Sequence, residues 1–202
     1  SAPVVLADGH HRFETACTYR DELRASGQPV GGADAILTLV VELVEEELWI
    51  EPIHRLLDVP DGVDVRARLA DAFTIEPFGP PTPDAIDWLT TAMAERRALG
   101  LVDGSGLALA VPHTRPDGPD SAVVEDLVVP RLPEASWHYW HDAATTAALV
   151  EKGSATHVIL CSPVSVEQTR AVALAGERMP QKTTFFAPKP RTGLVLRLLD
   201  RD

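Results

Sequence analysis

Five consecutive residues near the start of the chain, Asp8 to Arg12, combine side chains that could handle phosphate chemistry. They read Asp-Gly-His-His-Arg and follow the short apolar run of residues 3–7. A chain that leaves a strand and turns into a helix presents free backbone N–H groups, and these donors together with the helix dipole favour an anion. Gly9 lacks a Cβ, so a ligand can approach the backbone closely, and the planar guanidinium of Arg12 suits the paired oxygens of a phosphate. The stretch therefore predicts a phosphate-binding corner built by Gly9, His11 and Arg12.

The corner also has a simpler interpretation, in which it serves only folding. Asp8 could cap the helix, Arg12 could pair with Glu14 or another acid, and both histidines could be ordinary surface residues. If the corner instead transfers a phosphoryl group, it needs positioning, charge neutralisation and a base near the acceptor hydroxyl. Asp8, Glu14 and His10 are the available groups, and a base from a part of the protein outside this chain is an equal alternative.

A second polar pair, His54 and Arg55, follows Pro52 in an otherwise apolar segment. Both side chains could reach the ligand of the corner and donate to its phosphate. Arg55 could equally form an ordinary ion pair with Glu51 or with one of the glutamates at 45–47.

The segment 177–189, which reads ERMPQKTTFFAPK, is the more persuasive partner for the corner. Lys182 and Lys189 offer point charges for a phosphate, and Thr183 offers a hydroxyl for a phosphate or for a magnesium-bound water. A proline-rich surface strand with solvated lysines is the structural alternative. The segment is not a P-loop, because the glycine spacing of that motif is absent.

Patterns for a metal site or a nucleophile are weak. His138 and His141 lie three residues apart beside Asp142, but a strand would point the two histidines to opposite faces. No third histidine lies nearby, so we expect an aromatic strand or turn here and no metal. A Gly-x-Ser-x-Gly nucleophile motif is absent from the sequence.

Composition and charge exclude several classes of partner. The chain has 202 residues and a net charge of −12, which argues against a surface that binds nucleic acid. Its longest apolar run, residues 35–44, is shorter than the roughly 20 residues that a membrane span needs, and no signal peptide is visible. Cys17 and Cys161 lie far apart, so we expect two reduced thiols in a cytoplasmic protein, with a disulfide as the alternative.

Apolar periodicity and turn residues predict an α+β fold, in which strands and helices intermix without a regular βαβ rhythm. The expected helices cover residues 10–25, 63–73, 83–99, 121–132, 143–152 and 166–175. The expected strands cover residues 3–7, 35–44, 48–57, 136–141 and 156–162, with a hairpin over 100–111 and two extended pieces over 182–199.

The chain is expected to form one compact unit, or two subdomains that meet around the corner. In the second case residues 1–60 and 155–202 form one subdomain, and residues 61–154 form a helical insert. The chain starts without methionine and enters a strand almost at once. This start predicts that the sequence is a piece of a longer protein.

Three long motifs resemble one bacterial and archaeal family, catalogued as domain of unknown function 1015. They are VLADGHHRFETACTYR at the corner, LWIEPIHRLL over 48–57, and AGERMPQKTTFFAPKPRTGLVLRLL over 175–199. The resemblance covers nearly the whole chain in the right order. Because members of that family are usually about twice this length, it implies that the chain is their C-terminal half.

A weaker likeness links the corner to the ParB and sulfiredoxin superfamily, whose members hold nucleotide phosphates at a strand-to-helix corner. Gly9, His11 and Arg12 match its Gly-x-His-Arg signature one by one. His10 stands where sulfiredoxin carries its reactive cysteine, so reduction of cysteine sulfinic acid is excluded. The free serine kinases of this superfamily have a related histidine-rich corner and need no cysteine.

The resemblance therefore implies a protein that binds a small-molecule nucleotide or a phosphorylated ligand, with ATP or ADP and Mg²⁺ as the expected cofactors. The preferred hypothesis is a kinase that transfers phosphate to a small hydroxy or amino acid. A non-catalytic module that switches a partner interface on nucleotide binding is the alternative, and an interaction module without a ligand is a third. A homodimer is compatible with the sequence.

Overall fold

The computed structural model describes residues 4–187, 189, 191 and 193–199, and its contacts divide the chain into two units. The sheet unit is Ile50–Phe185, and the terminal unit joins Ser1–Trp49 to Phe186–Asp202. This division differs from the expected subdomains. Residues 61–154 do not form a helical insert, because four strands from this range join the same sheet as strands from either side of it.

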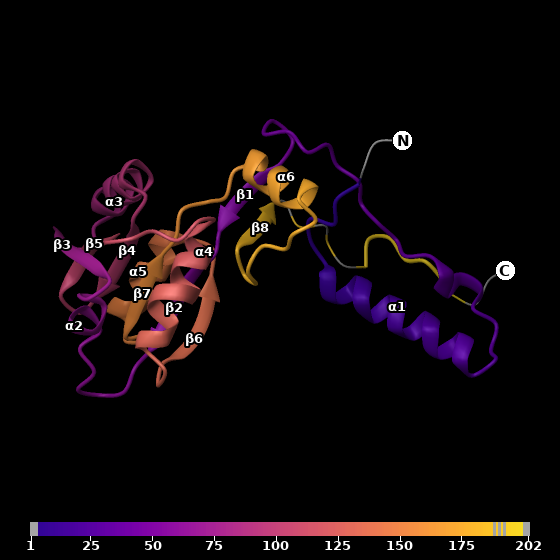
Figure 1. The fold of residues 1–202 in the computed structure, drawn as a ribbon, viewed down its shortest axis with the longest axis horizontal. Coiled ribbons are helices and arrows are strands. Elements are labelled where there is room, and N and C mark those ends of the chain that lie inside the picture. Colours follow the sequence, from indigo (N-terminus) through magenta and orange to yellow (C-terminus); the bar gives the residue numbers. More distant parts are fainter. Residues whose placement is uncertain (1–3, 188, 190, 192, 200–202) are drawn as a thin grey trace. The chain divides into compact units, whose positions relative to one another are not determined.

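The sheet unit contains a six-stranded sheet in which every neighbouring pair of strands is antiparallel (Figure 1). In spatial order its strands are β3 (Phe73–Gly79), β5 (Gly106–Pro112), β4 (Leu99–Asp103), β7 (His157–Leu160), β2 (His54–Asp58) and β6 (Ser136–Trp140). The expected hairpin is confirmed, since β4 and β5 pair with Asp103 opposite Gly106. The aromatic stretch 136–140 is the edge strand β6, also as expected.

The sheet unit also contains helices and short helical turns, which confirms the predicted α+β fold class. They are α2 (Val65–Leu69), α3 (Pro83–Arg96), α4 (Asp120–Val123), the π-helical turn η2 (Val124–Val128), the 3₁₀ turn η3 (Val129–Arg131), α5 (Ala143–Glu151) and α6 (Val166–Leu174). The helix expected over 63–73 is shorter than predicted, because Phe73 begins β3 and is buried in the core. Thr82 and Ser165 cap α3 and α6 with their hydroxyl groups, as residues at helix N-termini commonly do.

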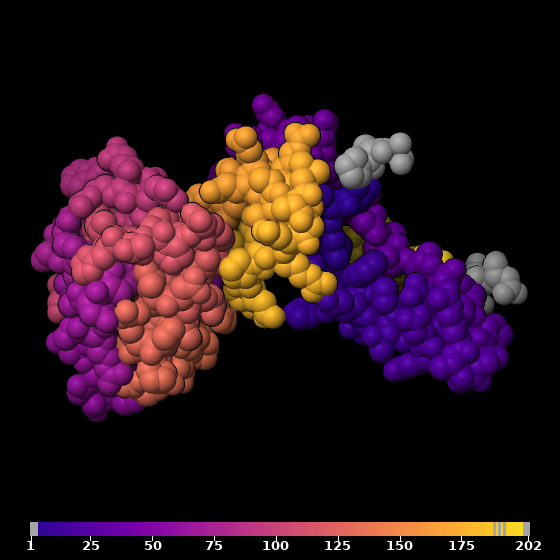
Figure 2. Space-filling view, viewed as in Figure 1, coloured from indigo at the N-terminus to yellow at the C-terminus, as the bar shows by residue number. Residues whose placement is uncertain are grey.

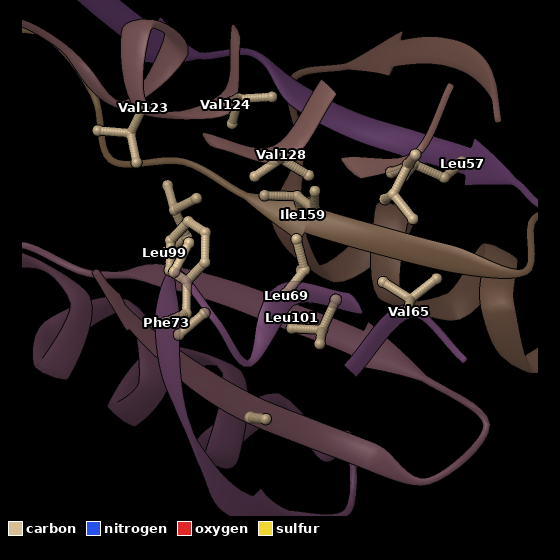
Figure 3. Close-up of a cluster of buried hydrophobic side chains, with 14 of the residues drawn as sticks. Leu57, Val65, Leu69, Phe73, Leu99, Leu101, Val123, Val124, Val128 and Ile159 are labelled. Atoms are coloured by element: carbon tan, nitrogen blue, oxygen red, sulfur yellow. The ribbon is translucent and has the colours of Figure 1, made fainter. Parts of the chain in front are cut away.

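Strand alternation divides the core into two clusters, one on each face of the sheet. Leu57 and Ile159 belong to the cluster drawn in Figure 3, which packs against α2, α4 and η2. Their strand neighbours Leu56 and Val158 belong to the second cluster, which packs against α3 and α5. Both faces of the central strands are therefore covered, and in Figure 2 the part coloured magenta to salmon forms a continuous mass.

The terminal unit holds the long helix α1 (His10–Ala25), at the predicted position, and the 3₁₀ turn η1 (Gly31–Asp34). Helix α1, indigo in Figure 2, contains no buried residue. The strands expected over 3–7 and 35–44 are wrong for the described residues 4–7 and 35–44, which carry no strand. Val4 and Val40 in these segments are more than two-thirds exposed, so neither segment has the pairing and burial that a strand requires.

Two short strands mark the boundaries between the units. β1 (Trp49–Pro52) and β8 (Thr184–Ala187) pair in a two-stranded sheet. Residues 48–57 were expected to be extended with a break at Pro52, and β1 ends there. Of the two extended pieces expected over 182–199, β8 is present, whereas residues 193–199 form no strand.

No helix in the described part of the chain combines the length and the apolar character that a membrane crossing requires.

Candidate functional site

The corner lies at the start of α1, where Gly9 occupies the position before the first helical residue. Gly9 has φ 84°, in the left-handed region that favours glycine, and its carbonyl accepts the N–H of Phe13 at 2.9 Å. Gly9 rather than Asp8 holds the N-cap position, and no side-chain cap bond is present among the described residues, so the interpretation of Asp8 as the cap is wrong. A Cβ on Gly9 would lie 3.1 Å from Nη2 of Arg12. The glycine therefore gives the Arg12 guanidinium room beside the first turn of the helix.

Two cations meet the same carboxylate oxygen at this corner. Lys189 Nζ lies 2.6 Å from Oδ2 of Asp8, and Arg12 Nη2 lies 3.6 Å from it. Partial burial would raise the pKa of Asp8, but the hydrogen bond and charge of Lys189, the Gly9 amide and Arg12 together hold that pKa below its ordinary value. Asp8 is therefore an ionised partner of two cations, which makes it a weak base.

The other predicted residues of the corner lie at the surface. His10, His11 and Glu14 are exposed, and Nδ1 of His11 lies 3.7 Å from Oε2 of Glu14. At this exposure such a pair contributes little to folding. The three side chains are thus accessible to a ligand that approaches the first turn of α1.

His54 and Arg55 are both buried in the sheet unit, but they do not serve one site. They are adjacent residues of β2, so their side chains project to opposite faces of the sheet. The two side chains therefore cannot approach a ligand from the same face of the sheet, and their contact with the ligand of the corner stays a prediction. The alternative ion pair is wrong, since Arg55 forms no ion pair with a described acidic residue; its Nη1 donates instead to the carbonyls of Ile53, at 2.5 Å, and Lys182, at 2.9 Å.

His54 is held as a neutral ring. Its Nδ1 accepts the backbone N–H of Cys161 at 3.2 Å, so the ring proton lies on Nε2. Burial lowers the pKa of His54 to about 4, with Arg55 and His141 lowering it further and Asp142 opposing them. A neutral buried imidazole that receives a backbone N–H is a structural group rather than a donor to phosphate.

Lys182 and Thr183 lie beside Arg55 but differ in what they offer. Nζ of Lys182 lies 5.8 Å from the centroid of the Tyr139 ring. The hydroxyl of Thr183 donates to the carbonyl of Pro180 at 2.6 Å, so the 2.6 Å contact with Ser121 must use the Ser121 proton. Thr183 is buried and its single proton is already in use, which leaves Lys182 as the donor of these two residues.

Asp120 and Arg115 form a buried ion pair that the sequence interpretation missed. Nη2 of Arg115 lies 2.5 Å from Oδ1 of Asp120, whose Oδ2 accepts the backbone N–H of Ser162 at 2.6 Å. Beside them, burial raises the pKa of the Cys161 thiol to about 12 despite the nearby Arg55. Asp120 directly after Pro119 at a helix start was the available signal, but such acids usually serve the helix alone.

The described structure thus arranges the predicted residues in two groups. Asp8 to Arg12, Glu14 and Lys189 belong to the terminal unit, whereas His54, Arg55, Lys182 and Thr183 belong to the sheet unit. Cys17 and Cys161 are both free thiols. Among the described residues no set of three or more His, Cys, Asp or Glu side chains could hold a metal ion.

Solved structures of two kinds share the fold. A conserved hypothetical protein from Pyrococcus furiosus matches with a TM-score of 0.53 at 18% identity, over 90% of this chain and 69% of its own. Free serine kinase in complex with AMP matches with a TM-score of 0.52 and 18% sequence identity. A mutant of free serine kinase in complex with ADP matches with a TM-score of 0.50 and 16% sequence identity. Each match covers 90% of this chain and 66% of the matched chain. The chain therefore spans about two thirds of the length of these structures. At such identities the likeness establishes the fold.

No curated protein sequence matches the chain significantly. A family model matches residues 1–135 of the 202. The expected family is confirmed by this match, whereas the likeness of the corner to the ParB and sulfiredoxin superfamily stays a prediction. The chain belongs to the family described as protein of unknown function (DUF1015).

Proposed function

We propose that this chain binds a nucleotide and holds its phosphates at the Gly9–Arg12 corner. The observation that carries the proposal is the meeting of Arg12 and Lys189 at Asp8, beside a helix start that no side chain caps. Free N–H groups and two cations are the donors that a phosphate uses. The shared fold with free serine kinase, whose structures contain AMP or ADP, supports a nucleotide over other phosphorylated ligands.

Asp8 is the counter-ion of the corner in this proposal. Its carboxylate neutralises Lys189 and Arg12 when no ligand is bound, and an incoming phosphate replaces it. A carboxylate held by two cations is a poor ligand for a divalent metal. Mg²⁺, if used, therefore arrives on the phosphates of ATP or ADP rather than in a site of the chain's own.

The finer proposal is phosphoryl transfer to a small hydroxy or amino acid. The acceptor hydroxyl forms a bond to the terminal phosphorus, the bond from that phosphorus to the bridging oxygen of the nucleotide breaks, and the hydroxyl proton passes to a base. Glu14 and His10 are exposed beside the corner and are better placed for this role than Asp8, whose pKa is lowered.

Replacing Arg12 with alanine is expected to weaken the binding of ADP or ATP about tenfold or more, because a hydrogen bond to a charged group contributes roughly 1.5–3 kcal/mol. Isothermal titration calorimetry with magnesium measures the change on the full chain. Arg20→Ala is the matched control, because Arg20 lies on the same helix and pairs with its neighbour Asp21. Equal affinities in all three proteins would contradict the proposal, and binding without turnover of any small acceptor would favour a nucleotide-responsive switch over a kinase.

Replacing Asp8 with asparagine is expected to strengthen phosphate binding up to about fivefold, since partly exposed charge pairs are worth roughly 0.2–1 kcal/mol. The amide keeps the shape of the carboxylate but removes its negative charge from beside Lys189 and Arg12. Titration with inorganic phosphate and with ADP measures the gain. A loss of affinity or of turnover would instead identify Asp8 as a group that contacts the ligand directly.

A further inference from the structure

Arg55 carries a buried positive charge without a counter-ion among the described residues. The side chain is 1% exposed, and Nη2 is fully enclosed with no hydrogen-bond partner in this structure. Its Nη1 is satisfied only by the neutral carbonyls of Ile53 and Lys182. Burying a charge in this way is costly unless an opposite charge and further hydrogen bonds compensate for it.

A second cation converges on the same aromatic ring. The guanidinium carbon of Arg55 lies 5.4 Å from the centroid of Tyr139, and Nζ of Lys182 lies 5.8 Å from it. Lys182 also has φ 57°, one of two non-glycine residues with a positive φ among the described positions. A strained backbone conformation of this kind persists where the surroundings impose it, and such positions cluster at ligand sites.

The nearby acids are already engaged by other groups. Asp120 is occupied by Arg115 and by the N–H of Ser162, and Oε2 of Glu51 lies 2.6 Å from Nδ1 of His141. Two like charges that face one ring repel each other unless an anion lies between them. The deficit of negative charge at this point of the sheet unit is the observation that requires an explanation.

We propose that the sheet unit has an oxyanion site of its own, in which Arg55 and Lys182 hold the phosphate or carboxylate group of a small ligand beside Tyr139. This site goes beyond the nucleotide corner, because every residue in it belongs to the sheet unit. Lys182 is exposed and Tyr139 is 42% exposed, so the ligand approaches from their side. Tyr139 lies directly opposite Arg55 on the edge strand β6, with the centroid of its ring 5.4 Å from the guanidinium carbon.

The test uses the full chain with Arg12→Ala as background, so that the proposed corner does not contribute to binding. Inorganic phosphate and acetate are titrated separately by calorimetry at constant ionic strength, and the two arms identify which oxyanion group the site takes. Adding Lys182→Gly removes the exposed cation and relieves the positive φ, so it leaves folding intact. Adding Arg55→Met removes the buried charge. Lys152→Ala is the control for an exposed lysine elsewhere in the sheet unit.

The background protein is expected to bind phosphate, acetate or both. Lys182→Gly and Arg55→Met are each expected to weaken that binding about tenfold or more, whereas Lys152→Ala should leave the affinity unchanged. Without anion, Arg55→Met is expected to melt no lower than the background, since an apolar replacement relieves the cost of an uncompensated charge. Absence of binding by the background protein, or binding that neither variant weakens, would overturn the site. Nucleotide binding by the unmodified chain tests the corner separately, so either proposal can fail alone.

Discussion

Replacing Asp120 with alanine is expected to lower the free energy of unfolding by about 3–5 kcal/mol, the usual cost of removing one partner from a buried ion pair. Asp120 and Arg115 are both largely buried and lie close together in sequence, but their further contacts reach parts of the sheet unit that are distant in sequence. Arg115 also donates to the carbonyl of Arg97 at the end of α3, while Asp120 accepts the N–H of Ser162 after β7. The carboxylate therefore connects the start of α4 with two other elements.

Without this carboxylate the remaining groups stay buried and lose their partners. Among the described residues Arg115 then keeps only the carbonyl of Arg97, because its Nε already has no hydrogen-bond partner there. The N–H of Ser162 loses its acceptor as well. An unpaired buried charge and an unpaired buried N–H are both unfavourable, which places the loss well above that of a surface substitution.

Urea unfolding followed by tryptophan fluorescence measures this loss, with Asp117→Ala as the control. Asp117 lies in the same loop but is exposed, so its replacement should change the free energy of unfolding by less than about 0.5 kcal/mol. Asp120→Asn should fall between the two, because the amide oxygen can still accept one N–H. Equal stability of the Asp120→Ala and Asp117→Ala proteins would mean that the pair is no more than a solvated contact.

Local patterns were sufficient to predict the elements whose stabilising contacts are near in sequence. The Asp-Gly step before α1, the proline at the start of α3 and the turn residues of the β4–β5 hairpin each lie next to the element they start or connect. The strand predicted over residues 35–44 is wrong because its stabilising contacts would have had to come from distant parts of the chain. The alternating apolar residues of this segment fit a strand, but a strand also needs a partner, and no local pattern provides one.

The candidate sites show the same division between local and distant information. The Gly9 conformation and the approach of Arg12 to the helix start follow from adjacent residues, and both could be expected from the sequence. That His54 and Arg55 face opposite sides of β2 was also implied once the segment was expected to be extended. The contact of Arg55 with the Lys182 carbonyl spans 127 residues, and its position opposite Tyr139 depends on strand register. Neither could be predicted without the fold.

The buried guanidinium of Arg55 has no evident role in forming the core. An apolar residue at position 55 would fill the same space at lower cost, because Leu57 and Ile159 on that face are packed by hydrophobic neighbours. Arg55, the Asp120–Arg115 pair and Cys161 nevertheless lie together at this end of the sheet unit. A buried cation that has no counter-ion among the described residues fits a site for an anionic ligand better than it fits a requirement of folding.

Lowering the pH from 6.5 to about 4 is expected to remove about 3 kcal/mol of stability through His54 alone, because its pKa is about 4 in the folded chain and near 6.5 unfolded. Between these values the unfolded chain binds the proton and the folded chain does not. The stabilising contribution is therefore complete above pH 6.5 and is lost as the pH falls through this window. Protonation would also convert Nδ1 from the acceptor of the Cys161 N–H into a donor.

His54→Asn isolates this effect, since the asparagine oxygen can accept the same N–H and does not titrate. His157 also has a pKa lowered mainly by burial, so the wild-type slope contains more than one contribution, and the difference between the two proteins is the quantity to measure. Urea unfolding at several pH values should give a smaller loss in His54→Asn by about 3 kcal/mol. Identical pH dependence in His54→Asn and the wild type would mean that the ring of His54 reaches solvent, and the neutral imidazole inferred for the end of β2 would have to be abandoned.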